Sequence, residues 1–328
     1  MKDLISILVP VYGTEKYIEK CVRSILDQTY PNIEIVIVND CTPDNSMTII
    51  RNLMASYLNR TNNIKIVNHT VNQGIAASRN DCIDAASGDF LFFLDSDDWI
   101  DHETIESLVN QQQETNADIV SCQVIVNEDE LKANYIEPHY PSRDAMLTHY
   151  LTQGWHHELH GRLIRSSLFT TNKIRFIPGC NMGEDWRVTP MLVYYAQRFA
   201  FVDKYFYHYR HNDNSICFSS KTEERRWELT RQTYHNFSSL FDFFKNKDRK
   251  YADVVINCCA SMCFQILMGA ISTKNKDIFL EFRKTMLDFP KEVRDRALSP
   301  SHAFALLLPF SYRIEVFRHY IAKLLKNN

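Results

Sequence analysis

The first hundred residues alternate between short apolar runs and longer amphipathic stretches. Strand-like runs lie at 4–10 (LISILVP), 33–38 (IEIVIV) and 64–68 (IKIVN), and helical stretches lie at 15–28, 45–59 and 75–86. This rhythm predicts β-strands joined by helical crossovers. Because such crossovers are right-handed, we expect the strands to form one parallel sheet, with the loops that follow them at one shared edge.

The segment FLFFLDSDDW at 90–99 contains the sharpest change from apolar to polar. Its apolar part does not alternate, which is typical of a strand covered on both faces. Asp95, Asp97 and Asp98 then follow within four positions. Carboxylates ~4 Å apart repel by roughly 4 kcal/mol at an effective dielectric of about 20, so we expect a partner cation, and hard oxygen ligands favour magnesium, manganese or calcium. An acidic loop that caps a helix is the alternative interpretation.

The α/β pattern continues beyond Trp99. We predict a helix at about 102–114, a strand at about 118–126, an insertion or acceptor loop in the polar stretch 127–145, a helix at about 184–197 and an aromatic strand at 201–210. Residues beyond 220 have an almost wholly helical pattern. We therefore place a domain boundary near 218, with an α/β domain at 1–218 and a helical region at 219–328.

Composition places the chain among globular proteins. Of its 328 residues, 45% are hydrophobic and 23% are charged, and the net charge of −3 argues against bulk electrostatic binding to nucleic acid. The nine cysteines are scattered without paired CxxC spacing and follow no leader-like segment, so we expect reduced thiols in the cytoplasm. No apolar run reaches the ~18 residues of a membrane span. Nothing in the sequence defines the oligomeric state.

The last 28 residues differ in charge from the rest of the chain. They carry four basic side chains and one acid, which gives +3 against −6 for the remainder. The segment IEVFRHYIAKLL at 314–325 has apolar residues at helical spacing. Two interpretations stay open: a helix packed on its own domain, and a peripheral helix on an anionic membrane surface.

Six segments, taken in order, resemble one known family. They are VPVYGTEKYIEKCVRSILDQTYPNIEIVIVND at 9–40, DCTPDNS at 40–46, NQGIAASRN at 72–80, FLFFLDSDDW at 90–99, GEDW at 183–186 and YRHNDNSI at 209–216. In order and spacing they resemble the family 2 glycosyltransferases of the GT-A fold. The resemblance implies a Rossmann-like, mostly parallel sheet that binds a nucleotide-sugar, most simply a UDP-sugar. It also implies transfer of the sugar to a hydroxyl with inversion, commonly in surface glycan synthesis.

The resemblance assigns the nucleoside to the first two strand ends. It implies that Asp40 accepts a hydrogen bond from the base, that Pro10, Val11 and Tyr12 support the base, and that Tyr12 stacks on its ring. The alternative for Asp40 is a turn residue, because Asp and Asn side chains bond their own backbone in such loops.

The segment NQGIAASRN suits a diphosphate. Asn72 and Gly74 precede a predicted helix, and Arg79 lies one turn into it, where a guanidinium suits a diphosphate through two parallel hydrogen bonds. A surface ion pair is the alternative for Arg79. We also expect Asp95 and Ser96 to contact the nucleotide-sugar.

The resemblance interprets Asp95 and Asp97 as a DxD metal site for Mn²⁺ or Mg²⁺, with Asp97 as the more direct ligand. Such an ion neutralises charge on a departing diphosphate. The resemblance further implies that Asp185 is the general base, with Glu184 supporting it, since a carboxylate can accept the proton of an acceptor hydroxyl. The alternative for Glu184 and Asp185 is a structural role, because acidic residues at the start of a helix are favoured by the helix dipole.

The remaining candidates are ambiguous. HHELH at 156–160 lacks the spacing of a zinc metalloprotease, because His160 is only two residues after Glu158. Trp155 and His157 are acceptor-side candidates or packing residues, and His208 and Arg210 are diphosphate-side candidates or structural residues.

We therefore predict a cytoplasmic, metal-dependent glycosyltransferase with a glycan or lipid-linked glycan acceptor. The rival functions are a nucleotidyltransferase, which has no use for a base at Asp185, and a non-catalytic protein that binds sugar nucleotides.

Overall fold

The computed structural model describes residues 2–57, 63–126, 134–135, 140, 142–153, 157–210, 222–298 and 312. These residues belong to two compact units: 1–150 with 154–220, and 151–153 with 221–328. The boundary predicted near 218 falls outside the described residues, as do Trp155, most of the expected insertion at 127–145 and most of the basic tail.

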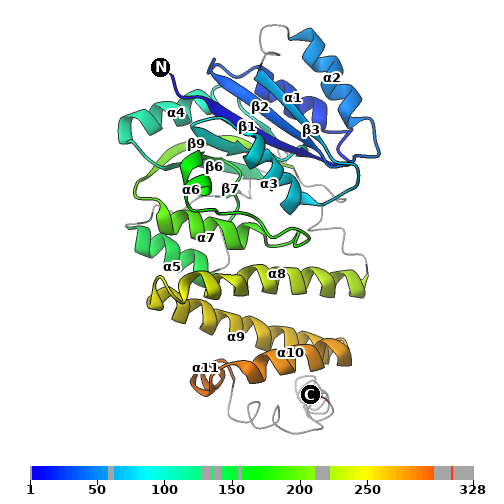
Figure 1. Ribbon diagram of the computed structural model, residues 1–328, viewed down its shortest axis with the longest axis vertical. Coiled ribbons are helices and arrows are strands. Elements are labelled where there is room, and N and C mark those ends of the chain that lie inside the picture. Colours follow the sequence, from blue (N-terminus) through cyan, green and yellow to red (C-terminus); the bar gives the residue numbers. More distant parts are fainter. Residues whose placement is uncertain are drawn as a thin grey trace. The chain divides into compact units, whose positions relative to one another are not determined.

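The first unit is built on one mixed sheet with the strand order β3-β2-β1-β4-β8-β6-β9-β5, and β7 pairs with β6 (Figure 1). The strands are β1 (Ile5–Val11), β2 (Ile33–Asn39), β3 (Ile64–Asn68), β4 (Phe90–Phe93), β5 (Trp99–Ile100), β6 (Ile119–Val126), β7 (Asn134–Tyr135), β8 (Arg162–Arg165) and β9 (Phe199–Tyr209). β1 to β4 are parallel neighbours, as predicted. β8 runs antiparallel to both β4 and β6, which the apolar pattern does not indicate. The α/β fold class is confirmed.

Seven helices of this unit lie among the described residues. They are α1 (Ile18–Leu26), α2 (Ser46–Ser56), α3 (Ile75–Ala85), α4 (Thr104–Thr115), α5 (Arg143–Gln153), α6 (Ser166–Thr171) and α7 (Asp185–Tyr195). Five of them, α1 to α4 and α7, fall within three residues of the predicted bounds at each end. The C-terminal end of α5 is grouped with the second unit.

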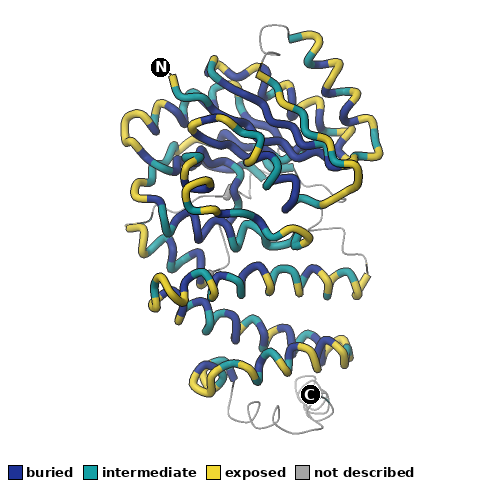
Figure 2. The backbone as a smooth tube through the Cα atoms, in the orientation of Figure 1, coloured by how far each residue is buried: buried dark blue, intermediate teal, exposed yellow. Residues whose placement is uncertain are grey.

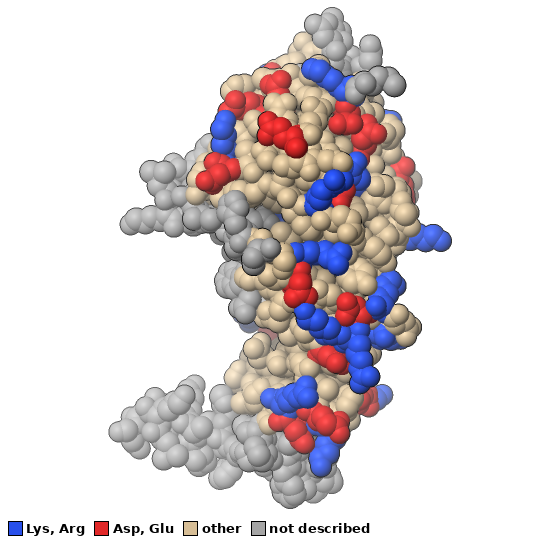
Figure 3. All heavy atoms as spheres, turned by 90° about the vertical axis from the view of Figure 1, so that its left-hand side faces the viewer, with Lys and Arg blue, Asp and Glu red and all other residues tan. Residues whose placement is uncertain are grey.

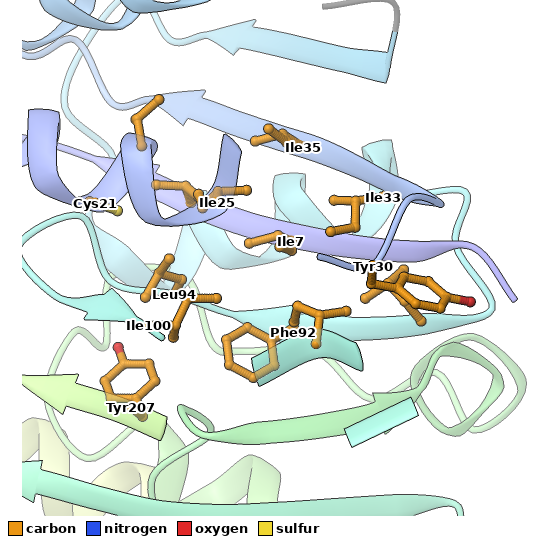
Figure 4. Close-up of a cluster of buried hydrophobic side chains, with 14 of the residues drawn as sticks. Ile7, Cys21, Ile25, Tyr30, Ile33, Ile35, Phe92, Leu94, Ile100 and Tyr207 are labelled. Atoms are coloured by element: carbon orange, nitrogen blue, oxygen red, sulfur yellow. The ribbon is translucent and has the colours of Figure 1, made fainter. Parts of the chain in front are cut away.

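Strands β1, β2 and β4 are buried on both faces, as their largely apolar runs predict, whereas β3 is only partly buried (Figure 2). Alternate positions of β1, such as Ile5 and Ile7, join one core cluster with residues of α1, α2 and α4. Leu8 and Val36 are equally buried and are not part of that cluster, and α3 contacts β1 and β2. In Figure 4, Tyr30 and Tyr207 lie at opposite ends of the drawn part of this cluster.

The second unit is helical, as predicted. Its described helices are α8 (Glu223–Phe244), α9 (Arg249–Ser272), α10 (Lys276–Asp288) and α11 (Lys291–Ala297). The side chains of Thr222, Asp248 and Asn275 cap the first three of them by accepting a backbone N–H.

Helix α9 is a long helix with an apolar composition. By length and composition it could cross a membrane, which the search for unbroken apolar runs in the sequence does not indicate. Its buried residues, among them Cys259, Cys263 and Leu267, belong to a face of the helix, and α9 contacts α8, α10 and α11. A core helix of a helical unit passes the same test. On the face drawn in Figure 3, basic and acidic side chains are interspersed.

Candidate active site

The loops that follow β1 and β2 lie together at the carboxyl edge of the sheet. The backbone N–H of Asp40 donates to the carbonyl of Val11 at 3.0 Å, and the N–H of Gly13 donates to Oγ1 of Thr42 at 2.8 Å. Pro10 and Val11 are buried positions of β1, whereas the side chain of Tyr12 is 50% exposed. Tyr12 is therefore the one of these three that presents a ring to solvent at this edge.

The carboxylate of Asp40 holds the loop that follows β3. Its Oδ1 accepts the N–H of Gln73 at 2.7 Å and also contacts Nδ1 of His69 at 2.7 Å. Its Oδ2 accepts the N–H of Gly74 at 2.8 Å. The residue is only 3% exposed. Asp40 thus orders the loop that precedes α3, whatever else it binds.

Asn72 and Gly74 lie in that loop. Asn72 is exposed. Gly74 has a φ of 86°, and a Cβ at this position would lie 2.3 Å from Nδ2 of Asn181. Oδ1 of Asn181 in turn accepts the N–H of Ala76 at 3.2 Å, so this asparagine packs against the start of α3. The glycine allows both the positive φ and this close approach.

The guanidinium of Arg79 brings three candidate acids together. Its Nη1 donates to Oε1 of Glu184 at 2.7 Å and to Oδ1 of Asp185 at 2.8 Å, and its Nη2 donates to Oδ1 of Asp95 at 3.1 Å. Arg79 is 5% exposed, so the surface ion pair considered above is wrong. One buried cation therefore joins the acidic loop after β4 to the start of α7.

Burial changes the proton affinities of this group. Desolvation raises the pKa of Asp185, and the nearby Arg79 only partly offsets this because Glu184 and Asp95 add like charge. Desolvation likewise raises the pKa of Glu184 against the opposing effect of Arg79. A carboxylate with a raised pKa is a better proton acceptor, which suits a general base.

The acidic loop is held from behind by Asp98, which the sequence analysis gave no role. Asp98 is 1% exposed, and it accepts the Tyr207 hydroxyl at 2.6 Å and the N–H of Arg210 at 2.7 Å. The same hydroxyl accepts the N–H of Asp95 at 3.3 Å. Asp98 therefore fixes the loop. The only indication of this role in the sequence is that Asp98 ends the acidic run DSDD, directly before Trp99.

The other two acids of the loop are more open. Asp95 and Asp97 are half-buried, and Ser96 between them is buried. The carbonyl oxygen of Asp97 accepts Nε of Arg210 at 3.3 Å. Within the described ranges, no group of three or more His, Cys, Asp or Glu side chains is arranged to hold a metal ion. Two half-buried carboxylates fit an ion that takes its other ligands from water and phosphate, as Mg²⁺ does.

The ambiguous aromatic residues have partners in the structure. His157 is stacked on Trp186, with ring centroids 5.1 Å apart, and its Nε2 contacts the carbonyl of Tyr150. Burial lowers the pKa of His157 to about 4, so the ring is neutral. His208 is stacked on Trp99 and its Nε2 lies 2.9 Å from Oδ1 of Asp101. His208 thus has a packing role, and Arg210 lies against the acidic loop.

Solved structures with a similar backbone define the class of fold. S. aureus TarS 1–349 in complex with UDP-GlcNAc superposes with a TM-score of 0.70 at 20% identity, covering 97% of this chain and 89% of that one. The mannosyltransferase PcManGT from Pyrobaculum calidifontis, in complex with GDP-Man and Mn²⁺, gives a TM-score of 0.54 at 14% identity over 97% and 88%. The fold is that of a GT-A transferase.

Sequence comparison gives the family. Residues 6–183 match the model of glycosyl transferase family 2. The uncharacterized glycosyltransferase EpsJ of Bacillus subtilis is 30% identical over 296 residues, which cover 87% of this chain and 84% of EpsJ. The putative glycosyltransferase EpsH of the same organism is 32% identical over 268 residues, covering 79% and 76%. The chain belongs to glycosyl transferase family 2, and to its bacterial surface-polysaccharide type.

Proposed function

We propose that this glycosyltransferase moves a sugar from a UDP-sugar to an acceptor hydroxyl with inversion at the anomeric carbon, using a divalent ion. The observation that carries the proposal is the contact of one guanidinium, that of Arg79, with Asp95 on the donor side and with Asp185 on the acceptor side. The reacting groups of a single displacement need this proximity.

The roles of the side chains follow from their positions. Asp185 takes the proton of the acceptor hydroxyl as the new bond forms, and Glu184 keeps its proton affinity high. Arg79 is the fixed positive charge beside the diphosphate site, and a binding diphosphate competes with Asp95 for its Nη2. Asp40 and Tyr12 receive the base, with Asn72, Gly74 and Ser96 lining the donor.

Asp97 and Asp95 are the residues that would hold Mn²⁺ or Mg²⁺. Such an ion would supply charge neutralisation on the departing nucleoside diphosphate. Both carboxylates retain solvent access, and their oxygen atoms are the donors that these ions prefer.

The setting of the reaction is also proposed. Names of relatives such as the minor teichoic acid biosynthesis protein GgaB of Bacillus subtilis support a glycan or lipid-linked glycan acceptor in surface polymer synthesis. We place the enzyme in the cytoplasm, peripherally on the inner face of the membrane. UDP-GlcNAc bound to TarS supports a uridine nucleotide.

The test is Asp185→Asn, which keeps the shape of the side chain and removes its basicity. Transfer should fall by about 10²- to 10⁴-fold, while binding of UDP measured by calorimetry stays within about twofold of wild type. Asp84→Asn is the matched control, because Asp84 pairs with Arg175 on the surface outside the site. Unchanged transfer in Asp185→Asn contradicts the assigned base, and release of pyrophosphate in place of a nucleoside diphosphate indicates a nucleotidyltransferase.

A further inference from the structure

His69 is a buried imidazole between two carboxylates at the edge of the candidate donor site. Its Nδ1 lies 2.7 Å from Oδ1 of Asp40, and its Nε2 lies 2.7 Å from Oδ2 of Asp81. The side chain is 4% exposed. A ring nitrogen approaches an ionised carboxylate this closely only as a donor, so an imidazolium that donates from both nitrogens satisfies both contacts. No sequence motif described above contains His69.

The backbone fixes His69 in this place. The last residues of β2 and β3, Asn39 and Asn68, are register partners, and the amide of Asn39 donates to Oδ1 of Asn68 at 3.0 Å. One residue further on, the N–H of His69 donates to the carbonyl of Asn39 at 2.9 Å. Asp40 follows Asn39 directly, so the parallel ladder sets the imidazole beside this carboxylate.

The contacts of Asp40 leave one acceptor position. A carboxylate offers about four lone-pair sites, two on each oxygen. Oδ1 uses both of its sites, one for His69 and one for the N–H of Gln73. Oδ2 uses one for the N–H of Gly74. Counting the contacts made within the described residues, a single site on Oδ2 therefore remains for a ligand.

Exposed apolar side chains follow the two strands that neighbour β2. In the described part of the chain, the exposed large hydrophobic residues are Tyr12, Val71 and Leu280, and the first two are 50% and 62% exposed. Tyr12 follows β1, and Val71 lies in the loop after β3, which are the strands on either side of β2. Exposed apolar groups on both sides of a buried acceptor suit a flat heterocycle that donates one hydrogen bond.

We propose that His69, held by Asp81, makes the donor site selective for uracil or thymine nucleotides by filling Oδ1 of Asp40. This inference rests on the proposed function and concerns the base of the same donor. Uracil and thymine present one ring N–H, at N3, which matches one free acceptor site. Guanine presents two adjacent donors, N1–H and the 2-amino group, and needs both carboxylate oxygens. Cytosine and adenine present a ring nitrogen that is itself an acceptor and is repelled by a carboxylate.

The experiment measures dissociation constants of UDP, dTDP, GDP and CDP for the full chain, by calorimetry with Mn²⁺ present. We expect UDP or dTDP to bind at least tenfold more tightly than GDP and CDP. In His69→Ala, Oδ1 regains an acceptor site, and the ratio of the GDP to the UDP dissociation constant should fall at least fivefold. His69→Asn is the matched variant, because its amide nitrogen can replace Nδ1, and it should keep the wild-type ratio.

The ratio separates selectivity from a structural role. If His69 only supports the loop, His69→Ala weakens all four nucleotides alike and the ratio stays constant, which overturns the proposal. Equal or tighter binding of GDP by the wild-type chain also overturns it. Transfer from a GDP-sugar in that case would leave the proposed sugar transfer intact and overturn only its uridine donor, whereas failure to bind any of the four nucleotides contradicts both proposals.

Discussion

Arg79 donates from Nη1 to Oδ1 of Asp185 at 2.8 Å although the two residues are 106 positions apart in the chain. The contact lies among buried groups, and the same guanidinium reaches Glu184 and Asp95. One cation thus faces three carboxylates, so an excess of negative charge remains when all three are ionised, which is one reason why the pKa of Asp185 is raised.

Removing this cation should destabilise the fold. In Arg79→Met, the carboxylates lose their counter-charge, and breaking a buried pair from one side costs about 3–5 kcal/mol. We expect a loss of that size in the free energy of unfolding, measured by urea denaturation. Arg175→Met, which breaks a half-exposed pair with Asp84, is the control and should cost under about 1 kcal/mol. Equal losses in the two variants would contradict the central role of Arg79.

The pH dependence of transfer should reflect the base. Because burial raises the pKa of Asp185, kcat/KM should rise with pH through that raised pKa, above the ordinary range near ~4 for a carboxylate. Glu184→Gln removes a like charge, so the acidic limb should move to lower pH. The measurement is a profile of kcat/KM against pH for both proteins, and an unmoved limb argues against Asp185 as the titrating group.

Tyr207→Phe tests the support of the acidic loop. The variant removes the hydroxyl that donates to Asp98 and accepts from the N–H of Asp95. Leaving such buried polar groups unsatisfied costs about 1–3 kcal/mol. We expect that loss in denaturation, together with weaker Mn²⁺ binding, because the loop that carries Asp95 and Asp97 loses a tether. Tyr30→Phe, at the other end of the core cluster, should leave Mn²⁺ binding unchanged.

His69 should make stability depend on pH. Burial alone would lower the pKa of His69, but the hydrogen bonds to Asp40 and Asp81 outweigh it and raise the pKa. A histidine whose pKa is raised in the folded state contributes its full stabilisation at pH values below its ordinary pKa of ~6.5. That stabilisation is lost as the pH rises through the raised pKa. The unfolding free energy of wild type minus that of His69→Asn should therefore decrease from pH 6 towards pH 9. A constant difference would show that the imidazole does not titrate in this range.

Gly74→Ala and Gly179→Ala form a matched pair. Both glycines have positive φ, 86° and 81°, but a Cβ meets Asn181 at 2.3 Å in the first and nothing within 4 Å in the second. Backbone strain of about 1 kcal/mol or more applies to both. Gly74→Ala should therefore lose more stability than Gly179→Ala, and it should also lose nucleotide affinity. Melting temperatures measured with and without UDP test both effects. Equal effects would mean that Asn181 moves aside freely.

The apolar pattern predicts most of the first half of the sheet. The run FLFFL at 90–94 has no polar interruption, and a strand covered on both faces is the physical reason. β8 is harder to predict, because Arg162–Arg165 is a four-residue strand with a charge at each end. Its place between β4 and β6 depends on pairing between segments that lie far apart in the sequence.

The candidate acids come together as the resemblance implies, but their partners do not follow from sequence. Arg79 was expected at a diphosphate, and in the structure it binds Asp95, Glu184 and Asp185. Asp98 and Tyr207 are 109 positions apart. No local sequence pattern predicts such a contact, because it depends on the pairing of β9 with β5.

That pairing bears on when the enzyme matures during its synthesis. β5 directly follows the acidic loop, yet its partner β9 ends at Tyr209. Contacts between residues so far apart in sequence form slowly, because the chain loses the entropy of closing the loop before it gains the free energy of strand pairing. On the ribosome, a nascent chain that stops before Phe199 has made Asp95, Asp97 and Asp98 but lacks the Tyr207 hydroxyl that tethers them. The tethering of the acidic loop is therefore a late event, completed only after the residue 109 positions beyond Asp98 has been translated.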